Sequence, residues 1–302
     1  MVADARAELV DEPVQRGSAA AALAALRPYQ WTKNLLVFAG IVFAAKLGDP
    51  WRWAEAIACF AAYCAASSAA YLVNDVRDRE ADRAHPVKRF RPVASGDLSP
   101  YAAYRLSFVL FAGAFAIAAV LGPSSLGLLA VFVAAQLAYT LGLKHLVLVD
   151  VLLIAGLFVV RATAGAVAVD VTISPWLLLC TGLLALFLAL GKRKAELVLV
   201  ELQQTAGRKV LEGYSLASVD QLITVVAGAT IVAYALYTFT ARDSTTLMIT
   251  IPYVVFGVFR YILLLDRRSG VEEPDHVLVT DLPILGAVSA WVITCAAVLV
   301  LG

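Results

Sequence analysis

The sequence predicts an all-α integral membrane protein, and three observations lead to this fold class. Hydrophobic residues make up 61% of the 302 residues and charged residues only 16%, whereas soluble chains have roughly 45–50% and about 25%. The mean hydropathy is +0.82. Apolar stretches close to the roughly 20 residues that cross a bilayer recur along the chain. A soluble globule would expose much of this surface to water, so the bilayer is the better solvent.

Nine of these stretches predict nine transmembrane helices, whose limits are approximate. They are 34–48, 53–73, 102–121, 125–143, 146–169, 174–191, 219–240, 246–265 and 283–301. The first is short for a span. Residues 1–26 are rich in alanine and contain no continuous apolar core, so we expect a surface segment rather than a cleaved signal peptide. Residues 27–302 are expected to form a single transmembrane catalytic domain.

The distribution of Lys and Arg predicts the orientation of the helices, because cytoplasmic loops are enriched in these residues. With the N-terminus in the cytoplasm, most of the 24 Lys and Arg fall on the cytoplasmic side. They gather in the N-terminal segment and in three further regions, 74–105, 192–218 and 260–276. The opposite side has only Lys46, Arg52 and Arg242. We therefore expect a multi-pass protein of the cell membrane whose charged surface faces the cytoplasm.

Charge and cysteine content exclude several other classes of protein. The net charge of +1 provides no overall basic field for binding nucleic acid. The four cysteines show neither metal-ligand spacing nor a disulfide framework, and they lie inside apolar stretches as small core residues: Cys59, Cys64, Cys180 and Cys295. A secreted, disulfide-stabilised protein is therefore excluded.

The densest functional signal follows the second predicted span. If the helix continues, Asn74, Asp78 and Asp82 recur at every fourth position and share one face, with Asp75 beside them. Carboxylate and amide oxygens suit Mg²⁺ that is held jointly with phosphate oxygens. The alternative is a solvated helix end whose acids pair with neighbouring arginines. The adjoining apolar stretch places the cluster at the membrane surface, which favours function.

A basic loop follows at once, in which Lys88, Arg89 and Arg91 lie between two prolines. Arginine binds phosphate bidentately and lysine acts as a point charge. Alone, the loop is better explained as a determinant of topology. Beside the acidic motif, it predicts a site for a Mg²⁺–diphosphate.

A second charged cluster follows the sixth predicted span. Lys192 and Glu196 share a helical face and Arg193 lies beside them; the alternative is an anchor at the membrane interface. Arg161 lies deep in the fifth predicted span, where a cation is costly. It is expected either to line a polar cavity or to form an ion pair, with Asp150 or Asp170 as the partner.

Other polar residues lie at the cytoplasmic ends of predicted helices. Tyr139, Lys144 and Asp150 are expected to help line the same polar mouth. A lone histidine such as His145 is more often an interfacial residue than a base. Lys33, before the first predicted span, fits an anchor better than a ligand.

These motifs resemble those of a known family. The signature Asn-Asp-x-x-Asp-x-x-x-Asp at 74–82, the Arg-Pro-x-Ala-Ser-Gly at 91–96 and the nine spans are similar to the UbiA superfamily of intramembrane prenyltransferases. The resemblance covers the chain from about residue 27 and implies a UbiA-type bundle of nine transmembrane helices with an active-site cavity that faces the cytoplasm. The superfamily usually carries a second aspartate-rich motif after its sixth helix. This sequence departs from that pattern, with Lys192-Arg193-x-x-Glu196 in its place.

The departure is similar to one branch of the superfamily, the polyprenyl-phosphate phosphoribosyltransferases, as are the motifs at 27–34, 143–150, 158–165 and 174–176. The resemblance implies a pentosyltransferase that needs Mg²⁺. Its donor is 5-phosphoribosyl 1-diphosphate (PRPP) and its acceptor is decaprenyl phosphate or another polyprenyl phosphate. Its product feeds the synthesis of cell-wall arabinan in actinobacteria. It implies no nucleic-acid partner, and it leaves a homo-oligomer open.

Site roles follow from this reading as expectations. The metal ligands are Asn74, Asp75, Asp78 and Asp82. Catalytic roles are expected for Asp75, Asp78, Asp82, Lys192 and Glu196. Substrate binding is expected for Lys33, Lys88, Arg89, Arg91, Tyr139, Lys144, Asp150, Arg161, Lys192 and Arg193.

Three alternative functions remain open at this point. An aromatic prenyltransferase would use a polyprenyl diphosphate donor, but the cationic second motif counts against it. A transporter would explain Arg161, although transporters often show repeats or broken helices that this sequence lacks. The third alternative is a non-catalytic protein that binds lipid phosphates.

Overall fold

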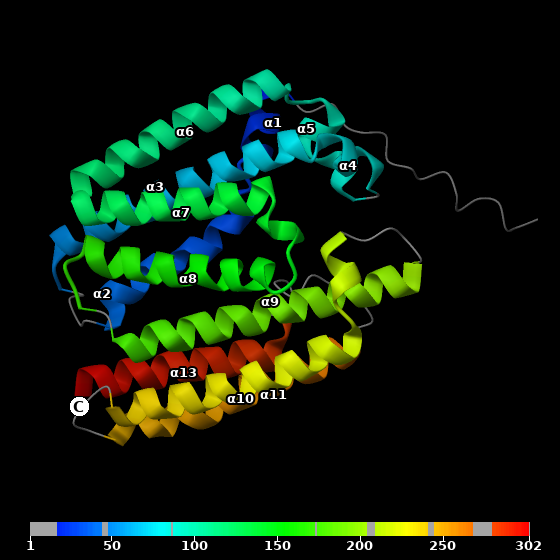
Figure 1. Ribbon diagram of the computed structural model, residues 1–302. Helices are drawn as coiled ribbons and strands as arrows, with labels where there is room; N and C mark the ends of the chain where they lie inside the picture. Colours follow the sequence, from blue (N-terminus) through cyan, green and yellow to red (C-terminus); the bar gives the residue numbers. More distant parts are fainter. Residues whose placement is uncertain are drawn as a thin grey trace, which may run out of the picture. The chain divides into compact units, whose positions relative to one another are not determined.

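The computed structural model describes residues 17–43, 48–85, 87–172, 174–203, 209–240, 245–267 and 280–301. Every regular element in these residues is a helix (Figure 1), which confirms the predicted all-α class. The chain divides into two compact units. The first contains the described residues of Met1–Leu35 and Ile57–Gln136, and the second contains those of Leu36–Ala56 and Leu137–Gly302. The expectation of a single catalytic domain stays a prediction.

The first unit is built mainly from long helices that follow one another in the chain. Its α-helices are α1 (Ser18–Ala25), most of α3 (Pro50–Arg77), α4 (Arg79–Ala84), α5 (Pro92–Ser95), α6 (Pro100–Leu121) and most of α7 (Pro123–Leu141). Two 3-10 segments accompany them, the start of η1 (Pro28–Phe38) and η2 (Lys88–Phe90). Ser99 caps α6 by accepting the N–H of Ala102, and Pro100 fits the first turn because its missing N–H needs no partner.

Small and aromatic residues hold the first unit together. Leu72 of α3 and Val93 of α5 are fully buried in one apolar cluster with Ala103 of α6. The rings of Tyr63 on α3 and Phe132 on α7 lie 4.8 Å apart between centroids. These contacts pack α3 against α5, α6 and α7.

The second unit contains the remaining helices. They are α2 (Ala39–Phe43), α8 (Val149–Ala168), α9 (Pro175–Gln203), α10 (Leu216–Thr240), α11 (Ile251–Arg267) and α13 (Leu282–Leu301), with the 3-10 segments η3 (Leu143–His145), η4 (Lys209–Gly213) and η5 (Thr245–Thr250). A large apolar core joins α8, α9, α10 and α11. At its centre the rings of Phe187 on α9 and Tyr261 on α11 are 5.2 Å apart between centroids.

Two glycines let the backbones of η1 and α2 touch the backbone of α8. A Cβ added to Gly165 would overlap the backbone of Val37, and one added to Gly40 would lie 2.7 Å from the Cα atom of Ala166. Backbone atoms on both sides cannot rotate out of the way as a side chain can. The absence of side chains at Gly40 and Gly165 is therefore a condition of this helix contact, of the kind that small residues provide inside membranes.

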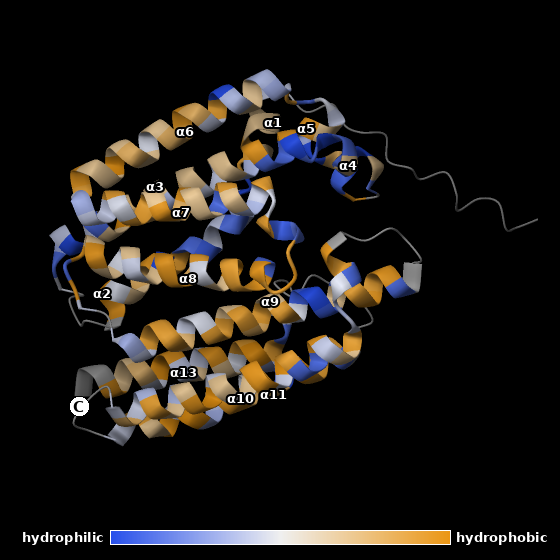
Figure 2. Cartoon of the chain, viewed as in Figure 1, coloured by the Kyte–Doolittle hydropathy of each residue, from blue (hydrophilic) through white to orange (hydrophobic). Residues whose placement is uncertain are grey.

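Seven helices among the described residues are long and apolar enough to cross a bilayer. They are Pro50–Arg77, Pro100–Leu121, Pro123–Leu141, Val149–Ala168, Pro175–Glu201, Leu216–Thr240 and Thr245–Asp266. The apolar helix Leu282–Val298 is shorter. Figure 2 shows hydrophobic residues along the long helices and hydrophilic residues gathered in α4. The protein is therefore a multi-pass membrane protein.

Two sequence expectations need correction or completion. The predicted span 34–48 is not one continuous α-helix where it is described, because η1 continues to Phe38 and α2 follows it. Residues 44–47 lie outside the described residues, so the count of nine spans stays a prediction. The predicted sixth span ends at 191, whereas α9 continues to Gln203. The second charged cluster therefore lies on a helix, as the predicted helical face of Lys192 and Glu196 requires.

We expect Gly165→Ala to lower the stability of the protein by about 1–3 kcal/mol, because the new methyl group forces the backbones of η1 and α8 apart. Gly156, on the same helix, has open space around its Cα atom and supplies the matched control. Gly156→Ala should leave stability unchanged or raise it slightly. Thermal unfolding of both variants in detergent measures the difference; equal midpoints would contradict the close contact.

Candidate functional site

The acidic motif lies where α3 ends and α4 begins. The prediction that one helix continues through it is wrong at Asp78, which separates α3 from α4. The turn-by-turn spacing nevertheless persists, because the N–H of Asp78 donates to the carbonyl of Asn74 at 2.8 Å and the N–H of Asp82 donates to the carbonyl of Asp78 at 2.7 Å. Asp75 and Asp82 are almost completely buried, whereas Glu80 is exposed.

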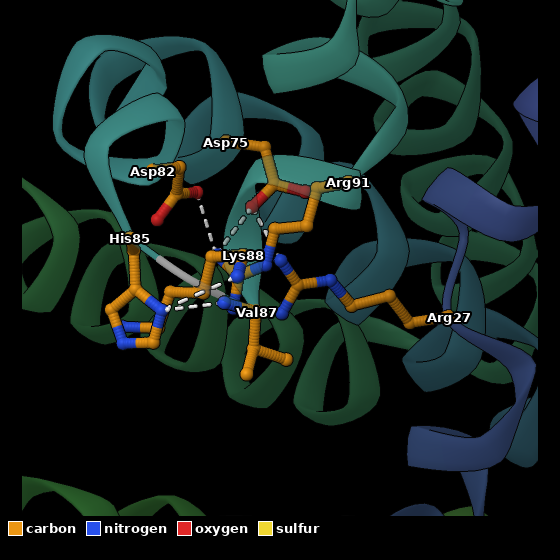
Figure 3. A network of polar contacts seen from close by, with 7 residues as sticks. All are labelled: Arg27, Asp75, Asp82, His85, Val87, Lys88 and Arg91. Atoms are coloured by element: carbon orange, nitrogen blue, oxygen red, sulfur yellow. Dashed lines mark hydrogen bonds and ion pairs between the residues drawn. The ribbon is translucent and has the colours of Figure 1, made fainter. Parts of the chain in front are cut away.

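Arg91 joins the two buried carboxylates. Its Nη1 atom donates to Oδ2 of Asp82 at 2.7 Å and to Oδ1 of Asp75 at 3.3 Å. Figure 3 shows Arg91 and Arg27 approaching Asp75 from different segments of the chain. Pro92 starts α5 immediately after Arg91, whose extended backbone lets the guanidinium reach back to the end of α3. The predicted acidic motif and basic loop therefore do meet.

Arg27 is a second partner of Asp75, and sequence reasoning gave it no role. It lies between α1 and η1, forms a hydrogen-bonded ion pair with Asp75, and stacks over the Tyr71 ring with its guanidinium carbon 5.0 Å from the centroid. Burial opposes the charge of Arg27, but the attraction of Asp75 outweighs burial and raises the pKa of Arg27. One feature of the sequence could have drawn attention to Arg27: it is the only cation between Arg16 and Lys33.

The rest of the basic loop is organised by His85. Its Nδ1 atom accepts the backbone N–H groups of Val87 at 3.2 Å and Lys88 at 3.3 Å (Figure 3). Arg89 is exposed and lies over the ring of Phe90, with its guanidinium carbon 4.8 Å from the centroid. His85 thus shapes the turn that presents Lys88 and Arg89, although the sequence gave no role to this residue.

The oxygens of the acidic motif fit a divalent cation. Among the described residues, no three side chains of His, Cys, Asp or Glu already converge as a metal site. Asp75 and Asp82 do converge on the same positively charged nitrogen of Arg91. Two buried carboxylates that share one cation are a suitable donor set for Mg²⁺, which takes oxygen ligands and completes its shell with water or phosphate.

In the second unit, Arg193 lies at the centre of a group of polar side chains, here named the Arg193 cluster: Asp150, Arg193, Glu196 and Tyr214. The Arg193 side chain is 2% exposed; its Nε atom lies 2.9 Å from Oδ2 of the fully buried Asp150, and its Nη1 atom donates to Glu196. The structure thus brings together Asp150, Arg193 and Glu196 from α8 and α9. Tyr214, which sequence reasoning missed, completes the cluster by donating to Oδ1 of Asp150 at 2.8 Å. Burial raises the pKa of Tyr214 to about 12.

Lysines 192 and 194 differ in their surroundings. Lys194 is largely buried and joins three helices, because its ammonium lies 2.8 Å from Asp220 on α10 and also contacts Asp266 on α11. Lys192 is half-buried one residue before Arg193. The ion pairs of Lys194 therefore join the part of α9 that carries Arg193 to α10 and α11.

Arg161 is buried on α8, as its sequence position predicted. Its Nη1 atom donates to the carbonyl of Leu157 at 3.2 Å, and its guanidinium carbon lies 5.2 Å from the centroid of the Phe158 ring. The two carboxylates suggested as its partners contact other cations: Asp150 pairs with Arg193, and Asp170 lies 3.8 Å from Arg52.

The remaining predicted residues are half-buried, namely Lys33 on η1, Tyr139 on α7 and Lys144 on η3. The structure brings none of them into the ion pairs described above. Their predicted roles in substrate binding therefore stay predictions.

We expect Arg27→Met to destabilise the protein by about 3 kcal/mol, because it leaves the buried carboxylate of Asp75 with Arg91 alone. The double variant Arg27→Met/Asp75→Asn should lose less, since it no longer buries a carboxylate that has lost one of its two cations. Arg105→Met, at an exposed position on α6, is the control. Thermal unfolding in detergent provides the comparison, and a single variant as stable as the wild type would refute the role of this pair.

The chain as a whole is similar to several known proteins. The pattern of the UbiA prenyltransferase family matches residues 34–279. Decaprenyl-phosphate phosphoribosyltransferase of Mycolicibacterium smegmatis is 37% identical over 289 residues, which cover 90% of each chain. The enzyme of that name from Mycobacterium tuberculosis is 37% identical over 287 residues, 92% of this chain and 94% of that one.

Among solved structures, a UbiA homologue from Archaeoglobus fulgidus bound to GPP and Mg²⁺ matches with a TM-score of 0.73. It is 17% identical in sequence, and the match covers 91% of this chain and 97% of that one. At this identity the likeness establishes the fold.

Proposed function

Because the chain belongs to the UbiA prenyltransferase family, we propose that it transfers 5-phosphoribose from PRPP to a polyprenyl phosphate. Decaprenyl phosphate is the proposed acceptor, and the products are decaprenylphosphoryl-5-phosphoribose and diphosphate. The observation that carries this proposal is the 37% identity, across some nine-tenths of both chains, to enzymes with the name of this activity. The product then enters cell-wall arabinan synthesis, as the sequence resemblance implies.

Mg²⁺ is the proposed cofactor, held by Asp75, Asp78 and Asp82 with the amide oxygen of Asn74. When bound, it supplies positive charge that neutralises the diphosphate leaving group. The supporting observation is the convergence of Asp75 and Asp82 on one nitrogen of Arg91. Asp75 lies near the end of α3, which is apolar enough to cross a bilayer, and Asp82 lies on α4, which follows it.

The cations of the first unit are the proposed ligands of the donor phosphates. Arg91 can turn part of its planar guanidinium to a phosphate, and Lys88 and Arg89 supply further charge from the turn that His85 shapes. Lys33 has the same proposed role. Arg27 holds Asp75 in place, which makes it a positioning residue rather than a substrate ligand.

In the second unit, the proposed substrate contacts are those of the half-buried polar residues. Lys192, Lys144 and Tyr139 can meet a phosphate or the sugar, while Asp150 and Arg193 are buried and act through Glu196. Arg161 is proposed to contact the substrate from α8. Such a buried cation is costly to retain in a membrane helix without a role.

The chemistry is a displacement at the anomeric carbon of ribose. An oxygen of the lipid phosphate forms the new bond to C1, the bond from C1 to the diphosphate oxygen breaks, and the diphosphate leaves with that electron pair. The configuration at C1 inverts. The nucleophile is already anionic near neutral pH, since the second pKa of a phosphomonoester is about 6, so the protein needs no strong general base. Its side chains position the reactants and neutralise charge.

Orientation and compartment are part of the proposal. The donor is a water-soluble sugar phosphate made inside the cell, so the charged residues should face the cytoplasm and the protein should reside in the cell membrane. The bias of Lys and Arg toward one set of loops supports this orientation. The polyprenyl tail of the acceptor remains in the lipid.

A substrate-exchange assay on the purified protein in liposomes tests this function. One reaction contains labelled PRPP, polyprenyl phosphate and Mg²⁺, and the other contains a prenyl diphosphate and an aromatic acid. We expect a lipid-extractable phosphoribose in the first reaction only, with loss of the product on chelation. Product in the second reaction alone would instead make the protein an aromatic prenyltransferase, and no product in either would favour a transporter or a lipid-phosphate binder.

Within that assay, Asp78→Asn should reduce turnover by about a hundredfold or more, because it removes charge from the metal site. Glu80→Gln changes an exposed acid of the same segment and should keep turnover close to that of the wild type. The metal assignment would be wrong if both variants retained normal rates at limiting Mg²⁺.

A further inference from the structure

The Arg193 cluster buries more charge than a structural contact in a membrane protein requires. The Asp150 side chain is fully buried and that of Arg193 is 2% exposed, with 2.9 Å between the closest carboxylate oxygen and guanidinium nitrogen. Replacing such a pair by apolar residues often costs nothing or stabilises a protein. A contribution to stability therefore does not explain the cluster well, and a role in positioning one of its side chains explains it better.

Tyr214 fixes the buried carboxylate from the other side. Its hydroxyl donates to Oδ1 of Asp150 at 2.8 Å and accepts the backbone N–H of Leu148 at 2.8 Å. Leu148 has a φ of +66°, a conformation that is costly for a leucine and needs support from its surroundings. One phenol thus links the start of α8 to the segment before α10, and it leaves Asp150 a single orientation.

Glu196 is the member of the cluster that solvent can reach. Its side chain is 23% exposed, and Nη1 of Arg193 holds it from the preceding turn of α9. Arg193 contacts two carboxylates, so Asp150, Arg193 and Glu196 together carry a net negative charge. Hydroxyl groups would find in Glu196 an acceptor with a fixed position.

We propose that Glu196, held by Arg193, accepts hydrogen bonds from the ribose hydroxyls of the donor, and that Tyr214 is a positioning residue that fixes this pair through Asp150. The proposal rests on the proposed function and names the group that selects a sugar donor. A prenyl diphosphate has no hydroxyl to donate and would leave the carboxylate unpaired. A site built to bind a hydroxyl rejects an analogue that lacks it far more strongly than an apolar pocket does.

The first test compares donor use by the wild type, Glu196→Gln and Glu201→Gln. Glu201 is exposed farther along α9 and serves as the matched control. We expect Glu196→Gln to raise the KM for PRPP about tenfold or more, because a hydrogen bond to a charged acceptor is lost. The KM for polyprenyl phosphate should change by less than about twofold. Glu201→Gln should match the wild type in both.

A donor analogue makes the same test specific to the hydroxyls. The 2-deoxyribosyl analogue of PRPP reacts at a different intrinsic rate. The informative quantity is therefore the kcat/KM for PRPP divided by the kcat/KM for the analogue, compared between the wild type and Glu196→Gln. Glu196→Gln should reduce the preference of the wild type for PRPP by about tenfold. An unchanged preference, or an effect on the acceptor KM instead, would overturn the role of Glu196.

The second test concerns Tyr214. Tyr214→Phe keeps the ring and should raise the KM for PRPP, and the double variant Tyr214→Phe/Glu196→Gln should be no worse than Glu196→Gln alone, because both changes act through one carboxylate. A purely structural tyrosine would multiply the two effects, which would overturn the positioning role. Tyr253→Phe on α11 is the control. The Glu196 test stands whatever the stability of Tyr214→Phe.

Failure of this proposal is distinguishable from failure of the proposed function. If the wild type forms no phosphoribosyl lipid from PRPP, the function itself is wrong and the Glu196 proposal is overturned with it. If the wild type forms this product while Glu196→Gln keeps its donor KM and its preference for PRPP, the function stands and only the further inference is overturned.

Discussion

The constraint on which this structure depends is that a charged group buried in an apolar chain must have a partner of opposite charge. In the first unit Asp75 and Asp82 are buried, and the cations Arg27 and Arg91 neutralise them. In the second unit Asp150 is buried and Arg193 neutralises it. Because these partners come from separate segments, each ion pair also fixes the ends of several helices.

The two clusters differ in their balance of charges and, as we propose, in their chemistry. The first places Arg91, which precedes α5, and Arg27, which lies between α1 and η1, around two carboxylates, a set that suits a metal ion and a diphosphate. The second surrounds one arginine with two carboxylates and a phenol. The resemblance implies a second aspartate-rich motif at the latter position in other family members, so the change at 192–196 is where a different donor class would be recognised.

The apolar helices could be predicted from the sequence because hydropathy alone marks what a bilayer accepts. The stretch 102–121 corresponds to α6, and 219–240 lies within α10. The end of α9 was missed, because loss of hydropathy marks the end of the bilayer and not the end of the helix. The acidic motif and its contact with Arg91 could be anticipated from their short separation.

Long-range partners could not be predicted in the same way. Arg27 reaches Asp75 from an N-terminal segment, and Tyr214 reaches Asp150 from beyond α9. No periodicity records such pairs, since they depend on how helices pack. The same limit applied to Arg193: its sequence position suggested a substrate ligand, whereas the structure buries it between two acids.

Equilibrium binding of PRPP to the purified, full-length protein in the absence of acceptor tests the central claim most directly. We predict that binding requires Mg²⁺ and that an equal concentration of geranyl diphosphate does not displace the bound PRPP. Displacement by geranyl diphosphate, or its Mg²⁺-dependent binding in preference to PRPP, would contradict the claim that this chain is built for a sugar donor.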